Sequence, residues 1–185
     1  EKKTDSREGE LILVTPAYTG AMREVLGGFL APDANSTLRI SYGTVRSFHP
    51  DSENESDWPF TTGAQILAKD QGKEPFDAPI NLLEAIKAKQ YGPYAREELG
   101  GELPVDFLSA LDITNGNSGS ATLNDRGELV GLAFDGTTEG VASDVVFNGE
   151  STRAIHADTR YMLWVMDAID GADHIVREMG IEPSL

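Results

Sequence analysis

One serine in this sequence has the neighbours that covalent catalysis needs. Ser118 lies in the run Gly116-Asn117-Ser118-Gly119-Ser120. A serine hydroxyl attacks a carbonyl only when a base removes its proton and hydrogen-bond donors stabilise the oxyanion that forms. Glycine at position 116 lets the backbone curl, so that the N–H groups of Gly116 and Ser118 point at one spot. The run therefore predicts an acylating nucleophile, Ser118, with an oxyanion hole made by these two amides.

The segment after this loop predicts a β-hairpin. Strand-forming residues at 121–123 and 129–134 flank the turn Asn124-Asp125-Arg126-Gly127, a glycine-containing connection of hairpin length. In an α/β-hydrolase the nucleophile would instead sit between a strand and a helix. The hairpin favours a β-barrel of the trypsin-like serine peptidases. The competing interpretation of residues 116–120 is a polar turn without chemistry.

The sequence supplies no convincing base for Ser118. In the trypsin-like order the histidine and its aspartate precede the serine, and His49 is the only histidine upstream. We interpret His49 as a surface residue beside an acidic loop. His156, at the start of a predicted helix, suits a structural role, and His174 is expected to be exposed. We therefore expect this chain to be one part of a serine peptidase and to be inactive alone.

Two polar residues near Ser118 bear on the type of peptidase. Asn117 occupies the place where many trypsin-like enzymes carry an aspartate that pairs with a newly cut amino terminus. An amide cannot form that ion pair, so no activation of that kind is expected. Asp112 lies six residues before Ser118, the offset of the aspartate that selects Lys or Arg in trypsin. Because Leu111 and Ile113 flank it, we favour a buried, hydrogen-bonded residue at a strand end.

The composition limits the class of protein. The 185 residues include 31 acidic and 15 basic side chains, for a formal net charge of −16. Nucleic-acid binding needs clustered Lys and Arg, so no nucleic-acid partner is expected, whereas the free amino terminus of a peptide is favoured. There is no cysteine, which removes disulfides and thiolate chemistry, and we predict no metal and no cofactor. No apolar run approaches the roughly 18 residues of a membrane span.

The remaining positions divide into helical and strand-like segments. Residues 1–10 are polar and expected to fray; they contain no signal peptide and resemble the middle of a longer polypeptide. Pro16 suits the first turn of a helix that runs to Phe29. The other predictions are strands over 37–42 and 44–48, an acidic loop over 50–58, helices over 61–69 and from Pro79, and a closing helix over 154–179 with a break near Gly171.

Several separated motifs resemble one peptidase family. They occur in order between residues 17 and 180: Pro-Asp-Ala-Asn-Ser-Thr-Leu-Arg at 32–39, Glu-Pro-Phe-Asp at 74–77, and the segments 115–135 and 152–166. These segments resemble the bacterial dipeptidyl-peptidase 7 and 11 family of serine exopeptidases, whose members remove dipeptides from free amino termini. The resemblance implies peptide substrates with a free amino terminus, a homodimer, and a periplasmic or cell-surface location in Gram-negative bacteria.

The resemblance also implies a fold. Family members have a double β-barrel of the trypsin/chymotrypsin type with an inserted helical domain, and their catalytic His and Asp lie in the first barrel. The expected fold class is therefore mainly β with helices. Residues 1–33 would end the helical insertion, and residues 34–185 would form the second barrel with a C-terminal helix. The base that Ser118 lacks would then lie upstream.

The family has a specificity position on the strand that follows the nucleophile's hairpin. It is glycine in members that prefer a bulky apolar residue second from the substrate's terminus, and arginine in those that prefer Asp or Glu. Here that position is Gly136, so the resemblance implies a hydrophobic second residue. Asp135 is a candidate partner for the substrate's α-ammonium group; the alternative is a turn aspartate that precedes Gly136.

Two other functions stay open at this point. A trypsin-like or protease-Do-like serine endopeptidase would carry the same Gly-Asn-Ser-Gly run, and it would cleave peptides whose amino terminus is blocked. In a non-catalytic binding or assembly module, the loop at 116–120 would be a relic, and replacing Ser118 would leave activity intact.

Overall fold

The structure is a computed structural model of the chain, and it describes residues 2–27, 38, 40–48, 58–144 and 147–185. The chain divides into two compact units, residues 1–37 and 38–185, which we describe separately. His49, most of the predicted acidic loop over 50–58 and the predicted domain boundary at residue 33 lie outside the described residues.

The first unit contains one long helix, α1 (Lys2–Leu26). Residues 2–10 are helical and Pro16 lies inside the helix, so the predictions of a frayed start and of Pro16 in the first turn are wrong. The Lys, Arg and Glu residues before Pro16 are good helix formers. Gly27, with φ +63°, ends α1 in the left-handed conformation typical of helix C-termini. Four consecutive apolar side chains of α1 are between 60% and 80% exposed: Leu11, Ile12, Leu13 and Val14.

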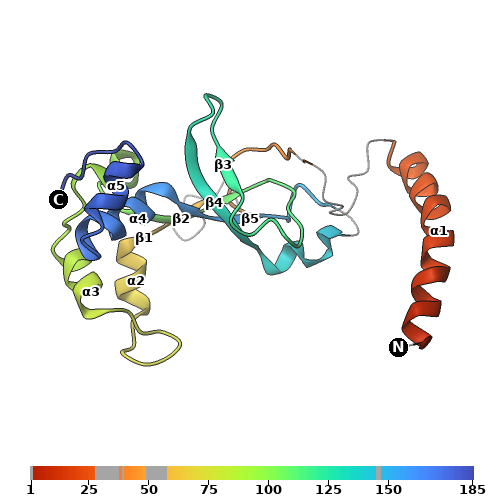
Figure 1. The fold of residues 1–185 in the computed structure, drawn as a ribbon, viewed down its shortest axis with the longest axis horizontal. Coiled ribbons are helices and arrows are strands. Elements are labelled where there is room, and N and C mark those ends of the chain that lie inside the picture. The colour runs from red at the N-terminus through yellow and green to blue at the C-terminus, as the bar shows by residue number, and fades with distance from the viewer. Residues whose placement is uncertain (1, 28–37, 39, 49–57, 145–146) are drawn as a thin grey trace. The chain divides into compact units, whose positions relative to one another are not determined.

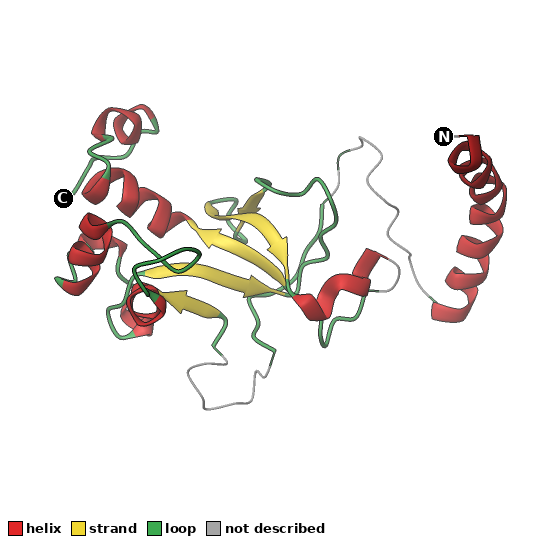
Figure 2. Cartoon of the chain, turned by 90° about the horizontal axis from the view of Figure 1, so that it is seen from below, coloured by secondary structure: helices red, strands yellow, loops and turns green. Residues whose placement is uncertain are grey.

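A five-stranded antiparallel sheet forms the centre of the second unit (Figures 1 and 2), with the strand order β1-β2-β5-β4-β3. The strands are β1 (Phe60–Thr62), β2 (Pro104–Ser109), β3 (Ala121–Leu123), β4 (Leu129–Gly136) and β5 (Ala154–Asp158). The predicted hairpin is confirmed, because β3 pairs antiparallel with β4. The described chain is thus mainly antiparallel sheet with helices, as predicted.

Strand β5 occupies the middle of the sheet, between β2 and β4. The prediction of a helix from residue 154 is wrong over these five residues. Their burial alternates, with Ala154, His156 and Asp158 buried, and this is the two-residue period of a strand. The closing helix begins only at α4 (Thr159–Trp164), continues as a π-helical turn (Val165–Ile169), and resumes as α5 (Asp173–Glu178) after the predicted break at Gly171.

Helices α2 to α5 gather at one end of the sheet (Figures 1 and 2). Helix α2 (Gly63–Lys69) follows β1 directly, and α3 (Ile80–Lys87) begins after Pro79 as predicted. Their apolar sides enclose a small core in which Ile86, Leu103 and Trp164 are almost fully buried. This core stabilises the end of the sheet that lies away from the Ser118 loop.

Residues 40–48 run along the edge of β2 rather than forming the two predicted strands. In the described part of this segment, the only strand-like pairing is a single bridge between Val45 and Ser109, so the strand predictions over 37–42 and 44–48 are wrong for these residues. Gly43 lies against β2, because a Cβ at this position would be 2.7 Å from the carbonyl oxygen of Ala110. Three side chains that alternate along the segment are between 84% and 92% exposed: Leu38, Ile40 and Tyr42.

Candidate active site

The Ser118 loop (residues 113–120) is held in a tight turn by its own hydrogen bonds. The Asn117 N–H donates to the Thr114 carbonyl at 3.2 Å, and Asn117 Oδ1 accepts from the Thr114 N–H at 2.8 Å. Gly116 and Gly119 have φ angles of +94° and +82°, which glycine adopts without strain. The side chain of Asn117 therefore organises the turn, a role that its position in the sequence did not indicate.

Backbone hydrogen bonds join this loop to β4. The Gly119 N–H donates to the Ala133 carbonyl at 2.7 Å, and the Ala133 N–H donates to the Ser120 carbonyl at 3.0 Å. The loop and the strand that carries the predicted specificity position are therefore one hydrogen-bonded unit.

A β-bulge lies where the loop meets β4. The pairing of β4 with β5 changes register between Ala133 and Asp135, which leaves Phe134 as an extra residue. Ser118 Oγ donates to the Phe134 carbonyl at 3.4 Å, a long hydrogen bond that leaves the hydroxyl easy to redirect. The Ser118 side chain is exposed.

The amides predicted to form the oxyanion hole are unoccupied. Within the described ranges of the chain, no group accepts a hydrogen bond from the N–H of Gly116 or of Ser118, whereas the N–H groups of Asn117, Gly119 and Ser120 all donate. Two free N–H groups beside an exposed hydroxyl are what an oxyanion hole requires.

An open cavity of about 230 Å³ brings the predicted site residues together. Gly116 and Ser118 line it from the loop, and Asp135 and Gly136 line it from β4. The remaining wall is formed by the short helix η4 (Thr138–Asp144) and by Thr152 and Arg153 before β5, with Ile113, Thr114, Asn115, Asn117, Phe134 and Thr137 completing the lining.

Gly136 leaves room in the cavity wall. The nearest heavy atom to a Cβ built at this position would be the carbonyl oxygen of Arg153, at 3.8 Å, so a Cβ would fit here without a clash. Asp135 is exposed, and its Oδ1 accepts from the Gly136 N–H at 2.7 Å. Asp135 lies within β4 and bonds the residue directly after it, and its carboxylate charge remains at the cavity surface.

Asp112 lies outside this lining. It is half-buried, and its carbonyl accepts a hydrogen bond from Ser41 Oγ at 2.7 Å. The trypsin-type role, in which an aspartate at this offset selects Lys or Arg, therefore finds no support in the cavity. The expected burial at a strand end is not met either, because β2 ends at Ser109, three residues before Asp112.

The similarities to known proteins agree with this geometry. Residues 1–181 match the family Peptidase S46. The chain belongs to the peptidase S46 family. It is 45% identical over 168 residues to dipeptidyl-peptidase 7 of Capnocytophaga gingivalis, and 38% identical over 204 residues to an Asp/Glu-specific dipeptidyl-peptidase of Shewanella putrefaciens. The predicted resemblance to the dipeptidyl-peptidase 7 and 11 family is confirmed.

A solved S46 structure has the same fold. The crystal structure of Porphyromonas endodontalis DPP11 in complex with the dipeptide Arg-Glu matches 98% of this chain with a TM-score of 0.84 and 31% sequence identity. The matched part is 26% of that crystallised chain, and the two curated relatives are covered over 23% and 28% of their lengths. The S46 chain described here thus spans about a quarter of the length of its relatives.

His156 has a structural role in the S46 chain. Its Nε2 lies 2.6 Å from Ser109 Oγ and its Nδ1 lies 2.8 Å from Thr122 Oγ1, so hydroxyl groups on β2 and β3 occupy both ring nitrogens. The ring stacks on Phe107, with 4.7 Å between centroids. Burial lowers the pKa of His156 to about 4, and the imidazole is therefore neutral near pH 7. The structural interpretation of His156 is confirmed.

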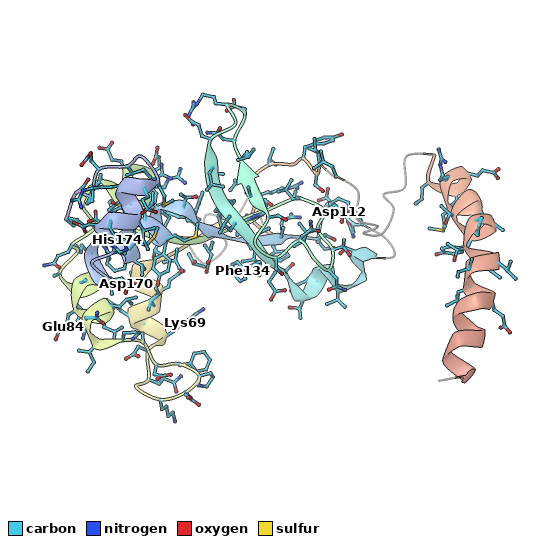
Figure 3. The ribbon with its side chains drawn as sticks, viewed as in Figure 1. Lys69, Glu84, Asp112, Phe134, Asp170 and His174 are labelled. Carbon is cyan, nitrogen blue, oxygen red and sulfur yellow. The ribbon has the colours of Figure 1, made fainter. Side chains whose placement is uncertain are left out.

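His174 is exposed, as predicted. Figure 3 labels it at the helical end of the unit, far from Phe134, whose carbonyl contacts Ser118. Since His156 is fully engaged in the sheet and His174 is distant, the described residues provide no histidine base for Ser118.

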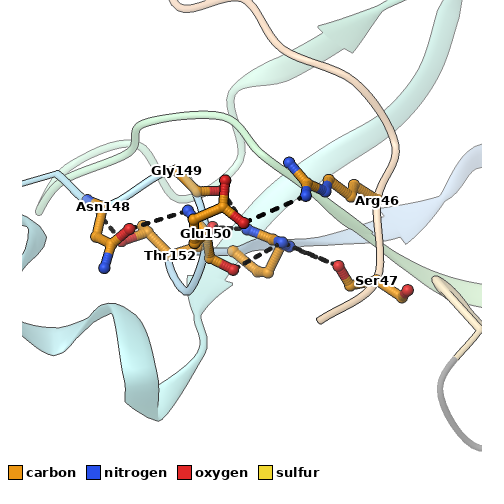
Figure 4. A network of polar contacts seen from close by, with 7 residues as sticks. Arg46, Ser47, Asn148, Gly149, Glu150 and Thr152 are labelled. Atoms are coloured by element: carbon orange, nitrogen blue, oxygen red, sulfur yellow. Dashed lines mark hydrogen bonds and ion pairs between the residues drawn. The ribbon is translucent and has the colours of Figure 1, made fainter. Parts of the chain in front are cut away.

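Arg153 lines the cavity and was not predicted to belong to the site. Its side chain is fully buried, and its five N–H groups donate five hydrogen bonds to backbone carbonyls. The acceptors surround it in the network of Figure 4: Ser47, Gly149, Glu150 and Thr152. A guanidinium has five donors in total, so none is left for a ligand.

Within the described ranges, no helix is both long enough and apolar enough to cross a bilayer. Those residues also contain no cluster of three His, Asp or Glu side chains that could hold a metal ion.

Proposed function

We propose that this chain is the nucleophile-bearing part of a serine dipeptidyl-peptidase, which releases dipeptides from the free amino terminus of peptides. Ser118 Oγ attacks the carbonyl carbon of the second residue, and the hydroxyl proton passes to the base. The amine of the remaining peptide then leaves with that proton, and water hydrolyses the acyl-enzyme. The single observation that carries the proposal is the exposed Ser118 on a cavity shared with Asp135 and Gly136, beside the N–H groups of Gly116 and Ser118, which donate to no other group in the described part of the chain.

The base and its orienting aspartate come from a part of the enzyme outside this chain. Support comes from the engagement of His156 with two hydroxyls and from the quarter-length match to S46 relatives. We propose that residues 34–185 form the second β-barrel of a trypsin-like double barrel and that residues 1–33 end a helical insertion. The same relationship suggests a homodimer in the periplasm or at the cell surface.

Two residues favour an apolar second residue in the substrate. Gly136 leaves the cavity wall open, so the pocket has depth and no side-chain charge at this position. Arg153 is the only cation among the described residues that line the cavity, and all five of its N–H donors are used by backbone carbonyls. An acidic substrate side chain would find no free guanidinium there. A dipeptidyl-peptidase 7 and an Asp/Glu-specific dipeptidyl-peptidase match this chain at 45% and 38% identity, so the proposed preference rests on the residues of the pocket.

Asp135 is proposed to bind the substrate's α-ammonium group. Its exposed carboxylate lies on the cavity beside the Ser118 loop, and one oxygen accepts from the Gly136 N–H. No ion pair engages Asp135 within the described residues. A charge-assisted hydrogen bond to the amino terminus would fix the distance between that terminus and Ser118. This fixed distance would restrict cleavage to dipeptides.

A serine-directed fluorophosphonate probe tests this function on the full-length enzyme and on the 185-residue chain. We expect labelling of the full-length enzyme at Ser118, no labelling of its Ser118→Ala variant, and none of the isolated chain. Robust labelling of the isolated chain would show that its base is not missing. Activity that survives Ser118→Ala would instead identify a non-catalytic module.

Peptides with free and acetylated amino termini separate the two kinds of peptidase. The exopeptidase should cleave only the free peptide after its second residue, because acetylation removes the charge that Asp135 would bind. Equal cleavage of the acetylated peptide would establish an endopeptidase of the trypsin or protease-Do type.

A further inference from the structure

The buried guanidinium of Arg153 joins two segments that are distant in sequence. Nε and Nη2 donate to the Ser47 carbonyl at 3.0 and 2.9 Å, a bidentate contact with the segment beside β2. Nη1 and Nη2 donate to the carbonyls of Gly149 and Glu150, each at 3.0 Å. The side chain is therefore a clamp between residues 46–48 and the turn at 148–152, as the network in Figure 4 illustrates.

This clamp fixes the position of Thr152. The Thr152 N–H donates to the Asn148 carbonyl at 2.7 Å, and Thr152 Oγ1 accepts from the Asn148 N–H at 3.3 Å. Arg153 Nη1 also donates to the Thr152 carbonyl at 2.6 Å. Thr152 is 4% exposed, so its side chain has a single, well-defined environment.

Thr152 in turn supports the wall of the cavity formed by η4. Gly140 in η4 is buried, and a Cβ built on it would be 3.3 Å from Thr152 Cγ2, which means that the helix backbone packs closely on the threonine methyl. The next residue, Val141, lines the cavity. A shift of Thr152 would therefore move η4 and change the width of the cavity.

The backbone of Arg153 holds the other side of the same wall. Its carbonyl accepts from the Thr137 N–H at 3.0 Å, and the same carbonyl oxygen would be 3.8 Å from a Cβ built on Gly136, the proposed specificity position. Gly136 pairs with Ala154, the residue after Arg153. Arg153 thus positions η4 through its side chain, and it positions the end of β4 through its backbone.

We propose that Arg153 is a positioning residue for the pocket that receives the second residue of the substrate. Its hydrogen bonds fix the separation of η4 from Gly136, and this separation sets how well the pocket distinguishes a bulky apolar side chain from a small one. The inference rests on the proposed dipeptidyl-peptidase function. All five N–H donors of Arg153 are used by backbone carbonyls, so its guanidinium has none to offer the substrate.

Arginine suits this role for a physical reason. Its planar fork reaches four carbonyls in different directions at once, whereas lysine offers three donors on one nitrogen. An apolar residue would leave buried carbonyls without partners, and a buried acceptor without a hydrogen bond destabilises the fold. The turn at 148–152 would rearrange to recover those hydrogen bonds, and Thr152 would move with it.

The test compares full-length enzymes carrying Arg153→Met, Arg153→Lys, Thr152→Ser and, as a matched control, Arg46→Ala. Arg46 lies in the same network, but among the described residues its side chain is engaged only in a 3.5 Å ion pair with Glu150, whose side chain is 82% exposed. The readouts are the rate of fluorophosphonate labelling at Ser118, which needs no second-residue pocket, and the ratio of kcat/KM for dipeptidyl substrates with Leu or Ala as second residue.

We expect Arg153→Met to lower the Leu/Ala ratio about 10-fold, within the range that pocket contacts of this size provide, while labelling changes less than about 3-fold. Arg153→Lys should recover part of the ratio, and Thr152→Ser, which removes only the methyl group under Gly140, should lower it about 3-fold. Arg46→Ala should match the wild type. Arg153→Lys and Thr152→Ser are milder substitutions, and they keep the test valid if Arg153→Met does not fold.

An unchanged Leu/Ala ratio in folded Arg153→Lys and Thr152→Ser enzymes would overturn the role of Arg153. So would equal losses of labelling and of both activities, because they would indicate a general effect on the fold. A wild-type enzyme that neither labels at Ser118 nor cleaves dipeptidyl substrates would refute the proposed function, and this inference with it. Failure of the proposed function is therefore seen in the wild type, whereas failure of the Arg153 role alone is seen only in the variants.

Discussion

The Gly119 N–H donates to the carbonyl of Ala133 at 2.7 Å, and this hydrogen bond places the residue after Ser118 directly against β4. Three residues beyond Ala133, the same strand presents Gly136 to the cavity. The backbone of β4 therefore connects the proposed nucleophile, Ser118, with the proposed specificity position, Gly136. We expect a substitution at either position to alter the geometry of the other.

The side-chain amide of Asn117 should control the reactivity of Ser118. Asn117→Ala removes the acceptor for the Thr114 N–H and lets the loop relax. We expect fluorophosphonate labelling to slow by about 10-fold, since small misplacements of reacting groups are costly. Asn117→Asp retains an oxygen acceptor at the same place and should label at nearly the wild-type rate. A wild-type rate for Asn117→Ala would mean that the turn does not need this hydrogen bond.

Replacing Gly136 by arginine should change the substrate preference. The open space at this position admits a side chain, and a guanidinium there would have free donors, in contrast to that of Arg153. We expect kcat/KM to shift by about 30-fold or more from substrates with Leu as second residue toward those with Glu, as charge-assisted hydrogen bonds imply. Gly136→Ala is the control, and it should retain the apolar preference. A wild-type enzyme that already prefers Glu would contradict the assignment.

Gly131 and Gly136 lie on the same strand, but they should differ in how well they tolerate replacement by alanine. A Cβ at Gly131 would be 2.6 Å from Phe107 Cε1 and 2.7 Å from the Ala157 carbonyl oxygen, whereas at Gly136 the nearest atom is 3.8 Å away. We expect Gly131→Ala to lower the free energy of unfolding by about 2 kcal/mol or more and Gly136→Ala to change it by less than about 0.5 kcal/mol. Urea unfolding of both variants measures the difference, and equal values would rule out the predicted clash.

The buried imidazole of His156 should make stability depend on pH. Its pKa is about 4 in the fold and about 6.5 in an unfolded chain. Between these values the unfolded chain binds a proton that the folded chain does not, so the stabilisation is complete above pH 6.5 and is lost as pH falls toward 4. Between pH 7 and pH 4.5 we expect a loss of about 2 kcal/mol from this residue.

The His156→Gln variant isolates this effect. Burial raises the pKa of Asp106 and of Asp158, so these carboxyl groups act in the opposite sense and stabilise the fold as pH falls. The free energy of unfolding of wild type and variant is measured with urea at pH 7 and pH 4.5. The difference between the two proteins removes the contribution of the two carboxyl groups, because both proteins contain them. Equal pH dependence in the two proteins would show that His156 is protonated in the fold.

Local signals predicted the part of the site that is built from neighbouring residues. The hairpin of β3 and β4 depends on a short turn between alternating strands, and the Ser118 loop depends on glycines at fixed offsets, so both were visible in the sequence. The position of Gly136 followed from the resemblance, and the cavity brings it together with Ser118.

Features set by distant segments were missed. Residues 154–158 lead directly into a helix, and they become a strand because β2 and β4 flank them. Arg153 carried no sequence signal of burial, since one of its four carbonyl acceptors, that of Ser47, lies 106 residues away in the sequence.

The place of β5 in the sheet also bears on how the protein is made. Strands β2 and β4 are not adjacent, and the strand between them is the last of the five in the chain. During biosynthesis the sheet therefore exists only as two separate pairs until residues 154–158 leave the ribosome, and long-range pairing of this kind is slow. Because Arg153 and Thr152 arrive with the same segment, the cavity beside Ser118 cannot take shape while the polypeptide is still being extended through β4.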